Sequence, residues 1–362
     1  MISPSISGKA EKLTKQIRLQ FKKGRKYYEV GNFSRSLYYL KKLIDQIDYM
    51  INKPDDLDGL EFDLYYHTCR IYIYFEKPTL AYTICQRAQE IATKLQDDKQ
   101  LITCLDLQGD IKILQGNTNS AYDNYLKSLT IKLNLYGDNN IVVSKSYLKI
   151  GEIFDNEGKY DQALNMYNRA LTIDKNLLGS NHNDVATLYS KIGSIHDRQC
   201  KYDDALVMYV KALKIIRKKS NQKHSDTVAK LLSNIGTILH NQAKYDEALY
   251  VYKKSIKIYL KRYVKHHRDI NMLYDKMGSI YYKQGQYNEA LTIFNKVLKN
   301  RLLQSRFLQG DLIISDIITS CKYIGATYIG LGEYDKARTI YENSFRINLK
   351  FYLTEEHSDI IL

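Results

Sequence analysis

The stretch I-G-E-I-F-D-N-E-G-K-Y-D-Q-A-L-N-M-Y, from Ile150 to Tyr167, decides the fold because the chain repeats it. Related stretches start at Ile192, Ile235, Met277 and Ile324, and a weaker one starts at Gln108. Each contains a glycine followed twelve residues later by an alanine: Gly109–Ala121, Gly151–Ala163, Gly193–Ala205, Gly236–Ala248, Gly278–Ala290 and Gly325–Ala337. The glycines are 42, 42, 43, 42 and 47 residues apart. A fixed period in this range predicts a solenoid whose neighbouring repeats share one core.

Each period contains two helical patterns with a short turn between them. In one copy, Leu273, Met277 and Ile280 recur at three- and four-residue steps and predict the buried stripe of a first helix. Ala290 and Phe294 belong to the stripe of a second helix. Polar residues suited to the positive end of a helix stand near the start of each second helix: Asp161, Asp203, Asp246, Asn288 and Asp335.

This pattern resembles the tetratricopeptide repeat (TPR). The landmark positions of that family are filled in one copy by Tyr147, Ile150, Gly151, Phe154, Ala163, Tyr167 and Ala170. The repeat exceeds the usual length of about 34 residues. Together with L-L-G-S-N-H-N-D-V-A from Leu177, this resembles the kinesin light chain type of repeat. Gly24–Ser36 and Cys69–Ala81 extend the register upstream as degenerate copies. The resemblance implies an all-α, right-handed TPR superhelix of about eight helix-turn-helix repeats.

The register also predicts how the chain is divided. We expect a flexible N-terminus over residues 1–11 and a TPR array over residues 12–352, with degenerate repeats over about 12–98 and regular repeats over about 99–352. Residues 353–362 are expected to begin a ninth repeat or to form a C-terminal tail. An array that ends within a repeat leaves an apolar edge. We therefore expect either a longer parent protein or self-association through this edge.

Composition favours a cytoplasmic protein with a continuous core. Hydrophobic residues make up 44% of the chain, and 33 tyrosines with no tryptophan fill the large aromatic positions. The five cysteines are scattered without a C-x-x-C pair, which predicts reduced and mostly buried thiols. The N-terminus lacks the apolar run of a secretory signal, and no segment approaches the ~18 apolar residues of a membrane span.

Several motifs imitate catalytic or metal sites. His182-Asn-Asp184, His224-Ser-Asp226, His267-Arg-Asp269 and His357-Ser-Asp359 follow the repeat period and precede first helices, so we interpret their aspartates as helix caps. His267-Arg-Asp269 also resembles a kinase catalytic loop, but Tyr274 stands where that loop needs an asparagine. The sequence therefore predicts neither catalysis, nor a metal site, nor a cofactor.

The TPR resemblance implies that polar residues of the first helices line a concave groove able to bind an extended peptide or a helix. Carried over, the groove positions are Lys149, Glu152, Lys191, Ser194, Asn234, Thr237, Lys276, Ser279 and Tyr282, with Asp275 and His240 in the same set. Of the paired asparagines of kinesin light chains, only Asn234 matches. The lysine–asparagine clamp of chaperone-binding TPRs is missing, because Lys322 is followed by Ala326 where it needs asparagine. No specific cargo is therefore predicted.

The net charge of +14 indicates a second surface. Basic residues cluster at the end of two successive second helices and in the linkers behind them, and we predict a basic edge there for an acidic partner: Arg217, Lys218, Lys219, Lys261 and Arg262. Nucleic acid is less favoured, because Tyr259 and Tyr263 fit the helical stripe instead of standing free for stacking.

Three functions are compatible with the sequence. The first is a non-catalytic protein-interaction scaffold that binds its partner in the groove. The second is a TPR regulatory protein that senses a short peptide. The third is a binder of an acidic partner or of nucleic acid through the basic edge, which predicts strongly salt-sensitive binding.

Overall fold

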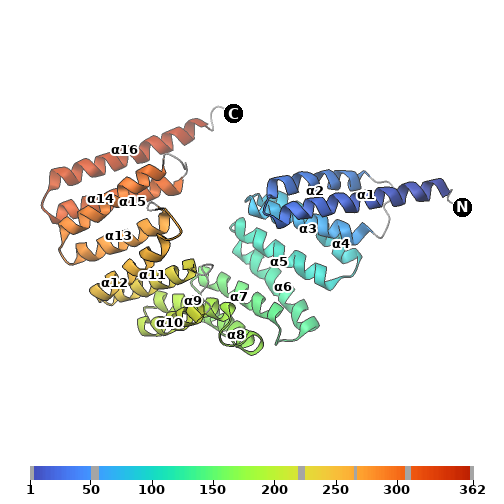
Figure 1. Ribbon diagram of the computed structural model, residues 1–362, viewed down its shortest axis with the longest axis horizontal. Helices are drawn as coiled ribbons and strands as arrows, with labels where there is room; N and C mark the ends of the chain where they lie inside the picture. The colour runs from blue at the N-terminus through green and yellow to red at the C-terminus, as the bar shows by residue number, and fades with distance from the viewer. Residues whose placement is uncertain (1–3, 50–56, 219–224, 265–266, 306–310, 359–362) are drawn as a thin grey trace. The chain divides into compact units, whose positions relative to one another are not determined.

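The fold consists of paired helices. The computed structural model describes residues 4–49, 57–218, 225–264, 267–305 and 311–358, and these form sixteen α-helices and no strand. They belong to two compact units, Met1–Ser180 and Asn181–Leu362, each of which contains four consecutive helix pairs (Figure 1). Among the described residues, no helix combines the length and apolar character needed to cross a bilayer.

The N-terminal unit contains eight helices. They are α1 (Pro4–Glu29), α2 (Phe33–Asp48), α3 (Asp58–Tyr74), α4 (Pro78–Lys94), α5 (Asp98–Leu114), α6 (Thr118–Tyr136), α7 (Ile141–Asn156) and α8 (Tyr160–Leu178). The odd-numbered helices are the first helices of the repeats. Helix α1 begins inside the segment 1–11 that the sequence divided from the array.

The C-terminal unit repeats this organisation. Its helices are α9 (Asn183–Arg198), α10 (Tyr202–Lys218), α11 (Ser225–Asn241), α12 (Tyr245–Tyr259), α13 (Arg268–Lys283), α14 (Tyr287–Gln304), α15 (Asp311–Gly330) and α16 (Tyr334–Ser358). Helix α16 continues past residue 352, so the expected boundary of the array falls within a helix. Four of the predicted acids, Asp161, Asp203, Asp246 and Asp335, lie in the first turns of second helices.

The turn between the paired helices has the same backbone conformation in every repeat. One residue with positive φ stands seven positions after the repeat glycine or its substitute: Gly31, Glu76, Gly116, Gly158, Cys200, Ala243, Gly285 and Gly332. This left-handed conformation reverses the chain at the end of a helix and favours glycine. The recurrence includes the turns of α1–α2 and α3–α4, so the degenerate copies share the register of the regular ones.

The repeat glycines allow the two helices of a pair to approach closely. A β-carbon at Gly151 would lie 2.6 Å from Cε1 of Tyr167, and one at Gly278 would lie 2.5 Å from Cε1 of Phe294. Both rings are at most 1% exposed. The recurring spacing therefore reflects a contact: an aromatic ring of the second helix occupies the volume that any larger residue of the first helix would need.

The remaining small residues are buried where the pattern requires. The alanines from Ala121 to Ala290 at this position are fully buried, and Ala337 is 3% exposed. In the degenerate copies the Ser36 hydroxyl donates to the carbonyl of Gly24 at 2.9 Å, and the Cys69 thiol donates to the carbonyl of Ala81 at 3.4 Å. Four of the five cysteines are buried, but Cys200 is exposed in its turn.

The caps of the first helices differ from the sequence-based prediction. His182 and His267, not the aspartates two residues later, occupy the N-cap positions of α9 and α13. Their Nδ1 atoms accept hydrogen bonds from the backbone N–H groups of Asp184 at 3.2 Å and Asp269 at 3.3 Å. Each aspartate lies in the first turn instead, where its charge still suits the positive end of the helix.

The distance between a repeat glycine and the ring that packs on it predicts how much a glycine-to-alanine substitution destabilises the fold. Gly278→Ala should lower the free energy of unfolding by about 1–3 kcal/mol, because Phe294 must move to admit the methyl group. A β-carbon at Gly193 would lie 3.1 Å from the nearest ring atom of Tyr209, so Gly193→Ala should be close to neutral. At this position, the higher helix propensity of alanine, which contributes about 1 kcal/mol relative to glycine, offsets the smaller steric clash with Tyr209. Chemical denaturation of both variants checks the order, and equal losses would contradict it.

Candidate functional site: the first-helix face

Three successive first helices of the C-terminal unit, α9, α11 and α13, carry most of the predicted groove residues. We call their polar side the first-helix face. Lys191, Ser194, Asn234, Thr237, Lys276 and Ser279 are half-buried there, and Tyr282 is 37% exposed. Partial burial means that neighbouring side chains restrain these groups while one side remains open to solvent. Such restraint lowers the entropy lost when a ligand binds.

Thr237 links two repeats. Its hydroxyl oxygen accepts hydrogen bonds from Nζ of Lys276 at 2.7 Å and from the Tyr252 hydroxyl at 3.4 Å, and the hydroxyl donates to the carbonyl of Ser233 at 2.9 Å. Lys276 belongs to the following repeat, whereas Tyr252 is the buried aromatic residue that packs on Gly236. The same contact that closes a helix pair therefore delivers a tyrosine hydroxyl to the first-helix face.

A parallel arrangement stands one repeat earlier. The Tyr209 hydroxyl hydrogen-bonds with Ser194 of its own repeat and Asn234 of the next. Burial, together with nearby Asp197, raises the pKa of Tyr209 to about 12, so this hydroxyl keeps its proton at neutral pH. In both repeats, a tyrosine hydroxyl, the residue that follows the repeat glycine, and a side chain of the next repeat are linked by hydrogen bonds. We call this recurring arrangement the polar ladder.

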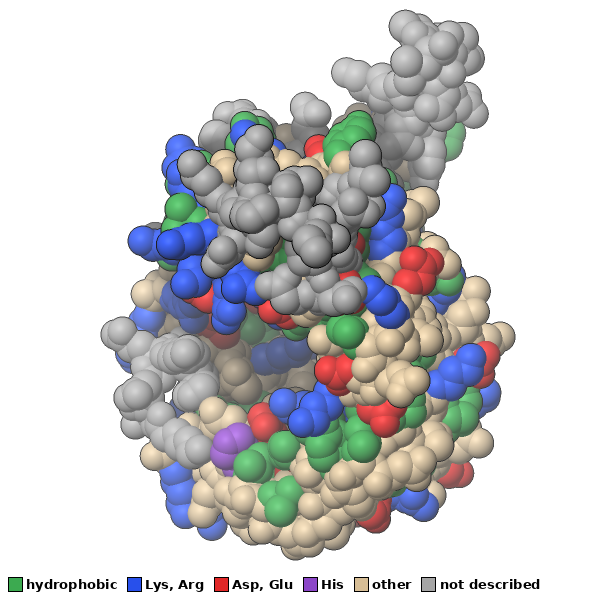
Figure 2. Space-filling view, turned by 90° about the vertical axis from the view of Figure 1, so that its right-hand side faces the viewer, with side chains coloured by type: hydrophobic (Ala, Val, Ile, Leu, Met, Phe, Trp, Pro, Cys, Tyr) green, Lys and Arg blue, Asp and Glu red, His purple; other side chains and the backbone are tan. Residues whose placement is uncertain are grey.

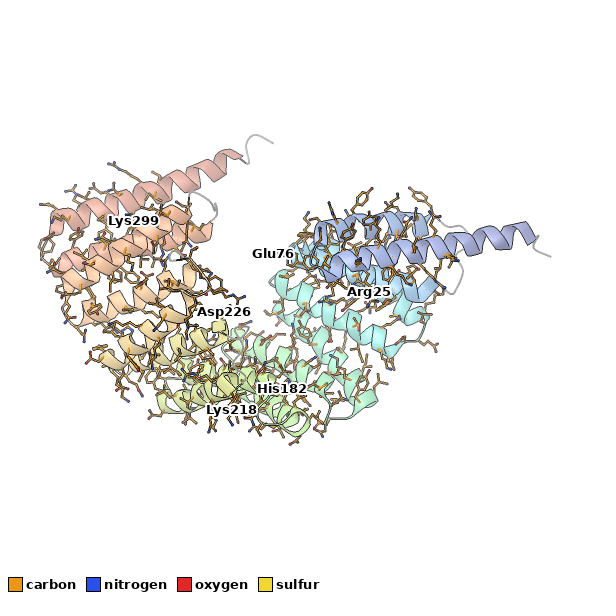
Figure 3. All side chains as sticks on the ribbon, viewed as in Figure 1. Arg25, Glu76, His182, Lys218, Asp226 and Lys299 are labelled. Carbon is orange, nitrogen blue, oxygen red and sulfur yellow. The ribbon has the colours of Figure 1, made fainter. Side chains whose placement is uncertain are left out.

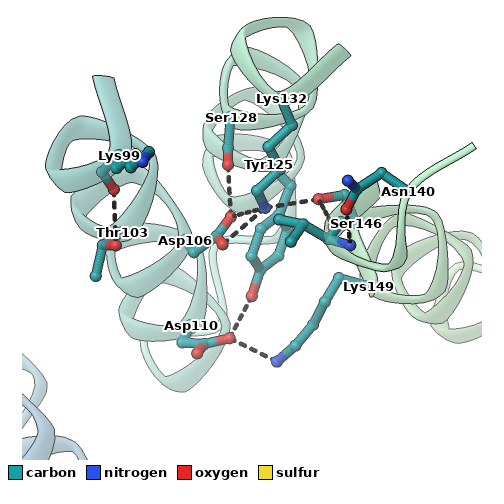
Figure 4. A network of polar contacts seen from close by, with 11 residues as sticks. Lys99, Thr103, Asp106, Asp110, Tyr125, Ser128, Lys132, Asn140, Ser146 and Lys149 are labelled. Atoms are coloured by element: carbon teal, nitrogen blue, oxygen red, sulfur yellow. Dashed lines mark hydrogen bonds and ion pairs between the residues drawn. The ribbon is translucent and has the colours of Figure 1, made fainter. Parts of the chain in front are cut away.

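The N-terminal unit contains a charged version of the polar ladder (Figure 4). Asp110 follows Gly109 and accepts from the Tyr125 hydroxyl at 2.5 Å and from Nζ of Lys149 at 2.7 Å. Lys149 is exposed, and Glu152 on the same helix is half-buried. Both predicted groove residues of this unit thus lie on its first-helix side.

Sequence reasoning missed the tyrosines as members of this face. It assigned them to the core, which is correct for their rings but not for their hydroxyls. The signal was present, because an aromatic residue follows each regular repeat glycine by sixteen residues, from Tyr125 to Tyr341.

Three titratable groups of the first-helix face, Asp197, His240 and Lys276, have shifted pKa values. Burial lowers the pKa of Lys276, and the carboxylate of Asp197 opposes this shift. Burial raises the pKa of Asp197, and Lys276 and Arg198 oppose it. Burial, followed by Lys283 and Lys276, lowers the pKa of His240. Asp197, His240 and Lys276 therefore form a cluster of titratable groups that is partly shielded from water. Hydrogen bonds to a ligand are stronger in such an environment than in bulk water.

A hollow of about 420 Å³ opens near the N-terminal ends of these helices. Its walls include Ser190 and Lys191 of α9, Lys230 of α11, Tyr259 of α12 and Asp269 of α13. The volume falls within the usual range of small-ligand sites. Lys191 connects the hollow with the rest of the first-helix face, and Asp226, marked in Figure 3, also lines it.

Asp275, which the TPR register placed in the groove, is instead buried. Its Oδ2 accepts from Nη2 of Arg301 at 2.6 Å, while Nη1 of Arg301 donates to the Ser320 hydroxyl at 2.6 Å. Asp275 is 8% and Arg301 3% exposed. Asp106 and Lys132 form the equivalent pair at the same 26-residue separation, with Nζ–Oδ2 of 2.8 Å. These pairs tie a second helix to its first helix, so this position serves packing.

The predicted basic edge is only partly free. Arg217, Lys218 and Lys261 are exposed, whereas Lys219 lies outside the described residues. Arg262 donates to Oδ2 of Asp226 at 2.8 Å, which ties it to a wall of the hollow. On the face drawn in Figure 2, Lys and Arg side chains gather in several groups with acidic side chains beside them.

The comparisons with known proteins agree with this architecture. The tetratricopeptide repeat family matches residues 101–176, 142–218 and 227–302 with one model and 324–351 with another, together more than half of the chain. The chain therefore belongs to the tetratricopeptide repeat family, and the predicted all-α TPR solenoid is confirmed. No curated protein matches the sequence.

Solved structures share the fold at low sequence identity. The apo form of RapI has a TM-score of 0.61 at 16% identity, covering 80% of this chain and 99% of that chain. A Rap protein complexed with competence and sporulation factor has a TM-score of 0.51 at 14% identity, covering 93% and 98%. A variant of the kinesin light chain-type repeats of Podosopora anserina has a TM-score of 0.50 at 13% identity, covering 56% and 95%. These likenesses concern the fold alone.

The buried pair predicts a pH-dependent penalty. Burial raises the pKa of Asp275 to about 6, and Arg301 opposes the shift. Because this pKa exceeds the unfolded value, the carboxyl group stabilises the fold most at low pH and loses that contribution as pH rises through about 6. Arg301→Met should therefore cost about 3 kcal/mol at pH 8, where the buried carboxylate is left unpaired, and less below pH 6.

The control for this experiment is Asp275→Leu/Arg301→Met, which removes both charges and should recover most of the loss. Chemical denaturation at pH 5 and pH 8 measures both variants. A penalty for Arg301→Met that does not change with pH would show that Asp275 does not titrate in this range.

Proposed function

We propose that the protein is a non-catalytic interaction scaffold that binds an extended peptide or a helix along the first-helix face. One observation carries the proposal. In the C-terminal unit, three successive first helices present restrained polar groups at equivalent positions beside a hollow of about 420 Å³. Repeated donors and acceptors suit the repeated amide groups of a peptide backbone.

The free, mostly buried thiols fit a reducing compartment, and we propose the cytoplasm.

A peptide-sensing regulator is a second proposal for the same face. The Rap protein that shares the fold was solved in complex with competence and sporulation factor. In this version, the bound peptide changes the shape of the chain, whereas a scaffold keeps its shape. Small-angle scattering with and without the bound peptide separates the two.

The binding face can be tested by photo-crosslinking followed by affinity measurement. A photoreactive residue replacing Tyr282 should attach to a partner segment, and one replacing Tyr250 should not, although Tyr250 of α12 is 60% exposed. A synthetic peptide of the captured segment should then bind Asn234→Ala and Lys276→Met about tenfold more weakly than the wild type, a loss of about 1.4 kcal/mol for a removed hydrogen bond.

Lys218→Glu is the control, because this exposed residue at the C-terminal end of α10, labelled in Figure 3, belongs neither to the polar ladder nor to the residues that line the hollow. Arg262→Glu would be ambiguous, since Arg262 holds Asp226 in the wall of the hollow. If Lys218→Glu abolished binding while Asn234→Ala and Lys276→Met left it intact, the proposed face would be wrong.

We also propose self-association through α16. Its side chains Tyr334, Phe345 and Leu349 are 69%, 66% and 47% exposed, which is unusual for large apolar groups on one helix. Sedimentation equilibrium should give a concentration-dependent mass for the wild type and a monomer for Phe345→Glu. A wild-type monomer at all concentrations would exclude this proposal.

A further inference from the structure

A second hollow, of about 510 Å³, lies between α12 and α13 and is separate from the polar ladder. Its apolar part consists of Ile256, Leu260, Tyr274 and Met277, and the charged residues that line it within the described ranges are Lys253, Lys257 and Lys261. We call it the lysine-rimmed hollow. None of the described residues that line it is acidic, whereas Asp226 and Asp269 line the hollow of the first-helix face.

The three lysines form one row. Lys253 and Lys257 are four residues apart on α12, so their β-carbons stand about one helical turn, ~5–6 Å, from each other, and Lys261 follows four residues later in the turn after the helix. All three are exposed, and none of their ammonium groups makes a hydrogen bond or ion pair within the described part of the chain.

Three arginines of this unit are paired with acids. Arg262 contacts Asp226 at 2.8 Å, Arg268 contacts Asp316 at 3.2 Å and Arg301 contacts Asp275 at 2.6 Å. The neighbouring Lys254 lies over the Tyr250 ring at 4.1 Å. Along the lysine-rimmed hollow, by contrast, three positive charges stand together without an acidic partner among the described residues.

A fourth ammonium group borders the apolar part. Nζ of Lys296, on α14, lies 4.1 Å from the centre of the Tyr274 ring. Tyr274 is half-buried, Met277 is 5% exposed and Leu260 is 40% exposed. A ligand entering here would therefore meet an apolar surface with ammonium groups supplied by α12 and α14.

We propose that the lysine-rimmed hollow binds an acidic amphipathic helix of a protein partner. Bulky apolar side chains of that helix enter the hollow, and glutamates or aspartates one turn apart pair with Lys253, Lys257 and Lys261. A helix repeats its side chains at the same spacing as the lysine row, which makes the two charge patterns complementary. This binding is independent of the first-helix face.

The test uses a short fluorescein-labelled helical peptide with leucine and phenylalanine one turn apart and glutamates beside them. Fluorescence anisotropy should show binding to the wild-type chain. Lys257→Glu should weaken it about tenfold, and Lys253→Glu/Lys257→Glu about a hundredfold, as each step removes an attraction and adds a repulsion. Lys254→Glu is the matched control and should change affinity by about twofold at most, because Lys254 does not line the hollow.

A charge-swapped peptide makes the test independent of folding defects. With lysines in place of the glutamates, it should bind Lys253→Glu/Lys257→Glu more tightly than the wild type. Peptides with alanine at both apolar positions, or with glutamine for glutamate, should bind the wild type about tenfold more weakly than the probe. Asn234→Ala and Lys276→Met should leave this binding unchanged, so failure here is distinct from failure at the first-helix face.

Four results would overturn the proposal. The first two are equal losses of peptide affinity for Lys254→Glu and Lys257→Glu, and equal affinities of the glutamate and glutamine peptides for the wild type. The third is displacement of the probe by dodecanoate with no requirement for a peptide helix. The fourth is tighter binding of a single-stranded oligonucleotide than of the probe. The last two would assign the hollow to an anionic amphiphile or to nucleic acid.

Discussion

The close approach of an aromatic ring to a glycine is the constraint on which each repeat depends. At Gly151 and Gly278 the missing side chain admits Tyr167 and Phe294, so the two helices of a pair meet at a fixed point. The positive φ seven residues later fixes the turn that brings the ring back to the glycine. Pair geometry therefore recurs along the chain, and the surface residues of each repeat stand at equivalent places.

The polar ladder follows from the same contact. A ring that packs on the repeat glycine carries its hydroxyl past the core to the first helices, where Tyr125 reaches Asp110 and Tyr252 reaches Thr237. Tyrosine supplies both a buried ring and a polar tip, and this explains why a chain without tryptophan keeps its aromatic core. Core packing and the proposed binding face therefore share the same residues, and selection on one acts on the other.

The sequence predicted the helix pairs well because their signal is local and repeated. The glycine-to-alanine step located even the copies at Gly24 and Cys69, whose turns share the common conformation. The sequence-based prediction was wrong where the position of a side chain depends on a partner from another helix. Asp275 fits the groove by position, but Arg301, 26 residues later, draws it into the core. Of the lysine row, the sequence-based basic edge included Lys261, whereas the apolar hollow beside the row requires α12 and α13 to be placed together.

Cys200 shows how the turn geometry determines chemical access. A β-carbon at the equivalent turn glycines, such as Gly158 and Gly285, would meet open space, and the Cys200 thiol is correspondingly exposed while the other four are buried. A maleimide reagent applied to the native chain should consequently label one site. A dye at this turn, between α9 and α10, would provide a spectroscopic reporter in the C-terminal unit without any engineered cysteine, as well as a point of immobilisation for single-molecule work.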